Sequence, residues 1–201
     1  MAPPVLNNRP DLILASGSPY RRELLKRVNY PFEWVSPDIN ESPRNGEAPG
    51  DLVLRLARAK AAKVAQAHPA AVVIGSDQLA TLGNQILGKP GDHDTAVRQL
   101  SACSGKSVVF LTAVCVRHDN AQFEETHIDT TTVNFRTLSG AEIETYVNAD
   151  EPLDCAGSFR SEGLGSALFK SIENVDPAAI IGLPMIWVSN SLRHAGVPIL
   201  A

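Results

Sequence analysis

The 201-residue sequence lacks the features that mark membrane and secreted proteins. No apolar run approaches the roughly 20 residues that a membrane helix needs, and the longest ones, 108–116 and 178–188, are interrupted by small or turn residues. The first ten residues carry three prolines and no hydrophobic segment, which predicts a loose arm over 1–10 and no secretory signal. These absences predict a cytoplasmic protein with no membrane partner.

Cysteine and histidine are scarce. Cys103, Cys115 and Cys155 are an odd number without CxxC spacing, which indicates reduced thiols rather than a disulfide framework or a zinc site. The five histidines form no HxH, HxxxH or HExxH pattern, so a histidine-built metal centre is not expected. The motifs GxxxxGK[ST], GxGxxG and GxSxG are also missing, which argues against a Walker loop, a dinucleotide fingerprint and a serine hydrolase.

The charge balance argues against an extended nucleic acid as the main partner. Eighteen Lys and Arg face 22 Asp and Glu, giving a net charge of -4, whereas such proteins usually carry a basic excess. The charges are unevenly distributed, because residues 1–106 hold 13 basic and 10 acidic residues and residues 107–201 hold 5 basic and 12 acidic ones. The first half is therefore net positive and the second half net negative.

Apolar periodicity predicts helices and strands in alternation, followed by two long antiparallel strands. Strands are expected at 12–15, 32–35, 71–75, 79–82, 85–87, 108–117, 123–135 and 168–172, and helices at 19–28, 51–68, 92–103, 139–148 and 183–196. This order predicts a mixed sheet in an α/β or α+β fold. The length predicts one domain, or two lobes that share one sheet, and we expect this single domain over residues 11–201.

A tight turn connects the first strand to the first helix. Ser18 is expected to cap this helix and Pro19 to occupy its first position, with Arg21 in the first turn. A helix start beside a guanidinium is a natural phosphate site, since both present donors and positive charge. The alternative is a capped helix with a surface arginine.

Asp77 lies at the carboxyl end of the apolar strand 71–75, and open α/β sheets usually bind ligands at the carboxyl ends of their strands. A carboxylate there is unfavourable unless it meets a metal, a cation or a proton-transfer task. A simple strand-end cap is the alternative. Glu41 lies in an acidic loop and Lys89 in a Gly-Lys-Pro turn, and a solvated loop would explain each.

Several segments, in this order, resemble the Maf-like nucleoside triphosphate pyrophosphatases over residues 12–196. They are LILASGSPYRRELL, the loop ending in Asn40-Glu41, LARAKA, IGSDQ, ILGKP, LSGAEIETYV, EPLDCAGSFRSEGLG and IIGLP. The resemblance implies an α/β fold with an elongated mixed β-sheet flanked by helices, in an inosine triphosphatase-like arrangement of two lobes around a deep cleft, and a homodimer. It also implies hydrolysis of a small-molecule nucleoside triphosphate to the monophosphate and pyrophosphate, with Mg²⁺ or Mn²⁺ as cofactor.

The resemblance also implies roles for individual residues. It implies Asp77 as the general base on the attacking water, and a divalent cation shared by Glu41 and Asp77. The phosphate-binding residues that it implies are Ser16, Arg21, Lys60 and Lys89. Asn40 stands where relatives often have an acid, which argues against a metal ligand at that position.

Two segments resemble the branch that acts on N7-methyl-GTP. They are Ser76-Asp77-Gln78, where the dTTP/UTP branch tends to have Ala-Asp-Thr, and 158–162, where that branch has a tyrosine-containing segment with glutamine. Specificity would rest on Tyr20, Gln78 and Glu162. N7-methylation makes guanine cationic, so Glu162 can attract the ring and accept hydrogen bonds from its N1–H and amine. Tyr20, where relatives often have tryptophan, can stack on the cationic ring.

Two other functions remain open. One is the same reaction on dTTP, UTP or another non-standard nucleotide. The other is a nucleotide-binding regulator of septum formation without turnover.

Overall fold

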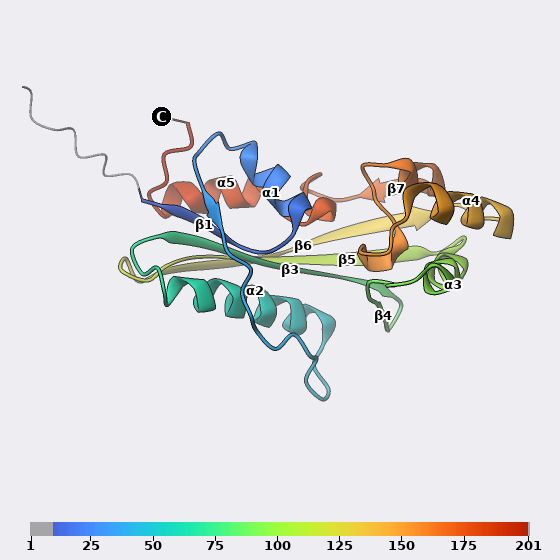
Figure 1. The fold of residues 1–201 in the computed structure, drawn as a ribbon, viewed down its shortest axis with the longest axis horizontal. Helices are drawn as coiled ribbons and strands as arrows, with labels where there is room; N and C mark the ends of the chain where they lie inside the picture. Colours follow the sequence, from blue (N-terminus) through green and yellow to red (C-terminus); the bar gives the residue numbers. More distant parts are fainter. Residues whose placement is uncertain (1–9, 201) are drawn as a thin grey trace, which may run out of the picture.

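The computed structural model describes residues 10–200, and one mixed β-sheet runs through them (Figure 1). The expected N-terminal arm, except Pro10, lies outside the described residues. The strand order is β2-β1-β3-β5-β6-β7, with β4 paired to the end of β3. Their bounds are Leu12–Ala15 (β1), Glu33–Trp34 (β2), Val72–Leu82 (β3), Gln85–Leu87 (β4), Ser107–His118 (β5), Phe123–Phe135 (β6) and Phe169–Glu173 (β7).

Strand β1 runs parallel to both of its neighbours and every other pair is antiparallel, which confirms the predicted mixed sheet. The described part of the chain has five α-helices, at Pro19–Lys26 (α1), Pro49–Ala65 (α2), His93–Cys103 (α3), Gly140–Asp150 (α4) and Met185–His194 (α5). All five were predicted. Helix α2 covers one face of the sheet, α1 and α5 cover the other, and α3 and α4 pack at one end of the long strands (Figure 1). None of the described helices has the length and hydrophobicity to cross a membrane.

The core consists of three apolar clusters, one for each group of helices. Leu14 and Leu24 belong to the cluster under α1 and α5, Val53 and Val73 to the cluster under α2, and Phe135 to the cluster at the α3–α4 end. Full burial of such a side chain stabilises the fold by roughly 1.5–3 kcal/mol. Two of the clusters lie on opposite faces of β1, β3 and β5, and the third lies at the α3–α4 end of the long strands.

The sequence prediction for β3 was wrong in one respect. The strand was expected to end at residue 75, but it continues to Leu82 because β5 pairs with it from Val73↔Arg117 to Thr81↔Val109. Its parallel partner β1 stops at Ala15, opposite Gly75. The residues just beyond, 76–78, therefore lie inside a strand and past the end of the parallel pair.

Helix α2 lies directly against β3 at Gly75. A Cβ at this position would lie 2.3 Å from the Ala57 carbonyl oxygen and 2.5 Å from the Ala61 backbone nitrogen. Only glycine permits this approach. Since side chains alternate along a strand, Asp77 points to the same face as position 75, toward α2, whereas Gln78 points to the opposite face.

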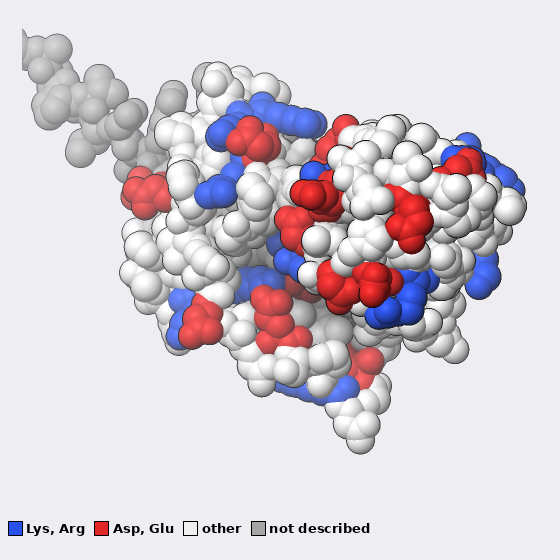
Figure 2. Space-filling model, turned by 45° about the vertical axis from the view of Figure 1, so that its right-hand side comes forward, with Lys and Arg blue, Asp and Glu red and all other residues white. Residues whose placement is uncertain are grey.

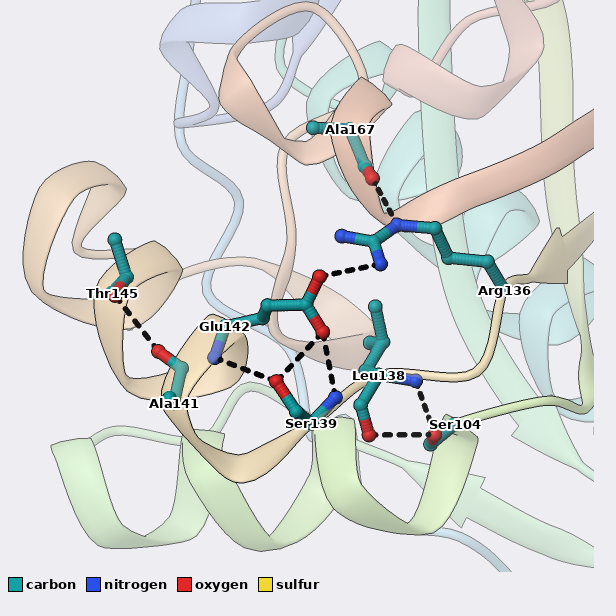
Figure 3. A network of polar contacts seen from close by, with 8 residues as sticks. All are labelled: Ser104, Arg136, Leu138, Ser139, Ala141, Glu142, Thr145 and Ala167. Atoms are coloured by element: carbon teal, nitrogen blue, oxygen red, sulfur yellow. Dashed lines mark hydrogen bonds and ion pairs between the residues drawn. The ribbon is translucent and has the colours of Figure 1, made fainter.

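The predicted capping box at the start of α4 is confirmed (Figure 3). The Glu142 backbone N–H donates to Ser139 Oγ (3.3 Å), and the Ser139 N–H donates to Glu142 Oε2 (2.7 Å). Arg136 donates to the other Glu142 oxygen (2.7 Å) and to the Ala167 carbonyl (2.7 Å). The Ser139 N–H, the Ser139 hydroxyl and then Arg136 lower the pKa of Glu142 to about 2. The network connects α4 to the segment before β7.

Replacing Ser139 with Ala should lower the free energy of unfolding by about 1 kcal/mol, since the N-terminal N–H groups of α4 lose their cap. Thermal denaturation at pH 7 should show a fall in Tm of roughly 2–4 °C. Thr137→Ala, an exposed hydroxyl two residues away, is the control and should leave Tm unchanged. Equal Tm values for the two variants would contradict a stabilising role for the capping box.

Candidate active site

A cavity of about 520 Å³ opens where β1 ends and β3 continues. This volume is within the range of small-ligand sites. Figure 2 shows a hollow in this region of the surface, with basic and acidic side chains close together around it. All nine site residues predicted from the sequence line the cavity, namely Ser16, Tyr20, Arg21, Glu41, Lys60, Asp77, Gln78, Lys89 and Glu162.

Lys60 connects the two predicted metal-binding carboxylates. Its Nζ lies 2.6 Å from Asp77 Oδ1 and 2.8 Å from Glu41 Oε1. The Lys60 side chain is only 9% exposed and that of Asp77 only 13%, whereas Glu41 is 56% exposed. A buried ammonium needs such counter-charges. The sequence grouped Lys60 with the phosphate-binding residues, and its pairing with the carboxylates was not predicted.

The two carboxylates fit a divalent cation. Glu41 and Asp77 already direct oxygens at one positive charge, and oxygen is the ligand that Mg²⁺ and Mn²⁺ prefer. Within residues 10–200, no three His, Cys, Asp or Glu side chains form a group able to hold a metal ion by themselves. Mg²⁺ sites commonly take remaining ligands from substrate phosphates and water. Asn40 is engaged elsewhere, because its Oδ1 accepts from the Ser42 N–H (2.9 Å).

Arg21 is positioned by the turn before α1 and by a distant glycine. Ser18 caps the helix as predicted, accepting from the Arg21 N–H (3.4 Å). The Arg21 Nε donates to the Gly182 carbonyl (3.0 Å), and Nη1 donates to Ser16 Oγ (3.4 Å). Burial lowers the pKa of Arg21, while the charges of Asp77 and Glu41 oppose that change. An arginine remains protonated at neutral pH, so this end of the cavity is cationic.

Tyr20 and Glu162 bring different chemistry to the cavity. Burial is the main cause that raises the pKa of Tyr20 to about 12, so its phenol is neutral at physiological pH. Its hydroxyl lies 4.0 Å from Cys155 Sγ. Glu162 is exposed, and its Oε2 accepts from Ser161 Oγ (2.9 Å). Lys89 is also exposed, in the turn where the sequence placed it.

The sequence reasoning missed several lining residues, chiefly in the segment 154–161. It used this stretch only for the family motif EPLDCAGSFRSEGLG and for Glu162, and the density of charged residues and glycines was the signal available there. Arg160 lines the cavity with its Nη2 donating to the Glu151 carbonyl (3.3 Å), and its buried Nε has no hydrogen-bond partner in the described part of the chain. Phe110 and Phe159 meet edge to face, with ring centroids 5.2 Å apart.

Lys60→Met should reduce the free energy of unfolding by about 2 kcal/mol, because Asp77 would keep a poorly solvated charge without its partner. Urea denaturation at pH 7 measures this loss. In an Asp77→Asn background the same change should be smaller by about 1 kcal/mol or more. Lys63→Met, an exposed site one turn along α2, is the control and should change little. Equal losses in both backgrounds would show that Lys60 and Asp77 are not coupled.

Comparison with known proteins places the chain in one family. A family model described as Maf-like protein matches residues 11–195. Proteins named 7-methyl-GTP pyrophosphatase are similar over 94% of this chain: one from Albidiferax ferrireducens (54% identity, 95% of its length), one from Alcanivorax borkumensis (52%, 95% of its length) and one from Pseudomonas aeruginosa (50%, 99% of its length). With the cavity and the ordered motifs, these matches show that the chain belongs to the Maf-like protein family.

Proposed function

We propose that this chain is a nucleoside triphosphate pyrophosphatase that hydrolyses N7-methyl-GTP to N7-methyl-GMP and pyrophosphate. The observation that carries the proposal is the meeting, in one cavity, of the carboxylate Asp77 with the cations Arg21, Lys60 and Lys89. The names of relatives at about 50% identity over nearly the whole chain support the substrate. Such an activity would remove modified nucleotides from the cell. We propose residues 11–201 as the single domain that performs it.

The proposed reaction is attack by water on the α-phosphorus. Asp77 accepts a proton from the attacking water while the water oxygen forms a bond to the α-phosphorus. The bond from the α-phosphorus to the oxygen that bridges to the β-phosphate breaks, and pyrophosphate leaves with that oxygen. The base has to lie close to the phosphates, and Asp77 lines the same cavity as Arg21, Lys60 and Lys89.

Three cations and one hydroxyl would hold the triphosphate. Arg21 presents a guanidinium at the start of α1, where backbone N–H groups also favour anions. Ser16 lies within hydrogen-bond distance of Arg21, so both can contact one phosphate. Lys60 and Lys89 supply two further charges, which stabilise the negative charge that develops on the leaving pyrophosphate.

Glu41 and Asp77 would hold the divalent cation, Mg²⁺ or Mn²⁺. When bound, such an ion neutralises phosphate charge and polarises the phosphoryl oxygen. The contacts of both carboxylates with the single Lys60 ammonium support the assignment, since they place two oxygen donors around one positive charge.

Tyr20, Gln78 and Glu162 would select the base. The purine is cationic after N7-methylation, and a neutral phenol ring can stack on a cationic face. The exposed carboxylate of Glu162 would attract that charge and accept hydrogen bonds from the guanine N1–H and amine. A uracil or thymine pocket would instead favour a neutral amide.

The proposal extends to compartment and assembly. Cys103, Cys115 and Cys155 are free thiols, and burial raises the pKa of each, which suits a reducing compartment such as the cytoplasm. The homodimer implied by the family resemblance is part of the same proposal. Light scattering after size-exclusion chromatography would measure it.

Asp77→Asn should lower kcat by about 10²- to 10⁴-fold without unfolding the protein, because the amide cannot accept the proton of the water. Pyrophosphate release from N7-methyl-GTP, GTP, UTP and dTTP is measured with Mg²⁺ and with Mn²⁺. The control is Asp94→Asn, with a side chain 88% exposed on α3. Near-normal turnover of Asp77→Asn would contradict its role as the base. Nucleotide binding without pyrophosphate release by the wild type would favour a regulator.

Glu162→Gln should lower the preference for N7-methyl-GTP over GTP by about tenfold, since the amide loses its attraction for the cationic ring. The ratio of kcat/KM for the two nucleotides is the measurement. Glu33→Gln, on the exposed strand β2, is the control and should keep the wild-type ratio. A wild-type preference for UTP or dTTP would refute the role given to Glu162.

A further inference from the structure

The turn formed by residues 179–182 is attached to the sheet through its backbone carbonyls. The carbonyls of Ala179, Ile180 and Gly182 all accept hydrogen bonds from side chains outside the turn. Ile180 and Ile181 line the substrate cavity. The hydrogen bonds to this turn therefore determine where part of the cavity wall lies.

Gln78 uses its amide nitrogen in this attachment. Nε2 lies within hydrogen-bond distance of Thr112 Oγ1 (2.8 Å), the Ala179 carbonyl oxygen (3.0 Å) and the Ile180 carbonyl oxygen (3.1 Å), and its two N–H groups are shared among these three acceptors. A carbonyl oxygen can only accept, so the NH₂ end of the amide has to face the turn. The remaining polar atom of the side chain is the carbonyl oxygen Oε1, an acceptor.

Thr112 adds a third acceptor for the same NH₂ group, whose direction the two carbonyls fix. It lies opposite Gln78 in the β3–β5 register, is 1% exposed and does not line the cavity. Its single hydroxyl proton goes to the Ala179 carbonyl (3.0 Å), which leaves a lone pair to accept from Gln78. The chain of donors thus runs from Gln78 through Thr112 to Ala179.

The same turn also holds Arg21. The Gly182 carbonyl accepts from Arg21 Nε (3.0 Å) and from the fully buried Ser76 hydroxyl (2.9 Å). Gly182 has φ +132°, and a Cβ there would lie 3.1 Å from Arg21 Nε. A displacement of the turn would therefore move the phosphate-binding guanidinium as well as the Gln78 amide.

We propose that Thr112 is a positioning residue for base selection: together with the Ala179 and Ile180 carbonyls, its hydroxyl oxygen holds the Gln78 amide so that the carbonyl oxygen Oε1 is the group offered to the nucleotide. Gln78 and Glu162 then both present acceptors to the cavity. Such a site selects a base edge rich in N–H donors, as in guanine, against uracil and thymine, whose edges carry two carbonyl acceptors around one N–H. This inference rests on the proposed nucleotide pyrophosphatase activity.

The test compares Thr112→Val, which keeps the shape but removes the hydroxyl, with Thr112→Ser, which keeps the hydroxyl. The ratio of kcat/KM for N7-methyl-GTP to that for UTP should fall about tenfold in the Val variant, chiefly through KM for N7-methyl-GTP. The Ser variant should stay within about twofold of wild type. Thr130→Val, at an exposed position on β6, is the matched control and should leave the ratio unchanged.

A purely structural role for Thr112 predicts a different result. The Val variant would then lose Tm and lose kcat/KM equally for both nucleotides, with an unchanged ratio, and that outcome overturns the inference. If the wild type releases pyrophosphate from none of the nucleotides, the proposed function fails instead.

A second measurement does not depend on the Val variant folding or on activity. In ¹H–¹⁵N spectra of the wild-type chain, the Gln78 side-chain NH₂ protons should exchange with solvent more slowly than those of the exposed Gln122. Equal exchange at the two side chains would overturn the hydrogen-bond arrangement that the proposal requires.

Discussion

The close approach of α2 to β3 at Gly75 is the constraint on which the site depends. Because no side chain separates the two backbones, Lys60 on the helix reaches Asp77 two residues further along the strand. The resulting ion pair is largely buried, and a buried ion pair is favourable only when its geometry is good and its charges are balanced. Glu41 from the preceding loop provides part of that balance. The packing of one helix on one strand thus creates the charged centre of the cavity.

The opposite face of β3 builds the other half of the site by a different means. There, hydroxyl and amide side chains donate hydrogen bonds to the backbone of the turn 179–182. The same turn accepts a hydrogen bond from Arg21. A single extended strand therefore supplies a carboxylate to one face and an amide to the other, since side chains alternate along it. The strand can do this only because it continues past the end of β1.

The net charge of -4 understates the local separation of charge. Arg21, Lys60 and Lys89 come from the net positive first half of the chain, and Glu162 comes from the net negative second half, yet all four line one cavity. Such a cavity suits a small ligand that is anionic at one end and cationic at the other. A nucleoside triphosphate with a methylated, positively charged base has this character.

The sequence alone determined the helices, most strand boundaries and the caps at Ser18 and Ser139, because these depend on local periodicity and on short-range hydrogen bonds. Through the order of its motifs it also indicated nine of the residues that line the cavity. Only the tertiary structure decided that β3 passes through Asp77, that Lys60 joins two carboxylates and that Thr112 accepts a hydrogen bond from Gln78. Each of these depends on a partner elsewhere in the chain, such as β5 for β3 or Ala179 for Gln78, 101 residues away. Packing brings such partners together, and a local pattern of residues cannot predict which distant residue a side chain will contact.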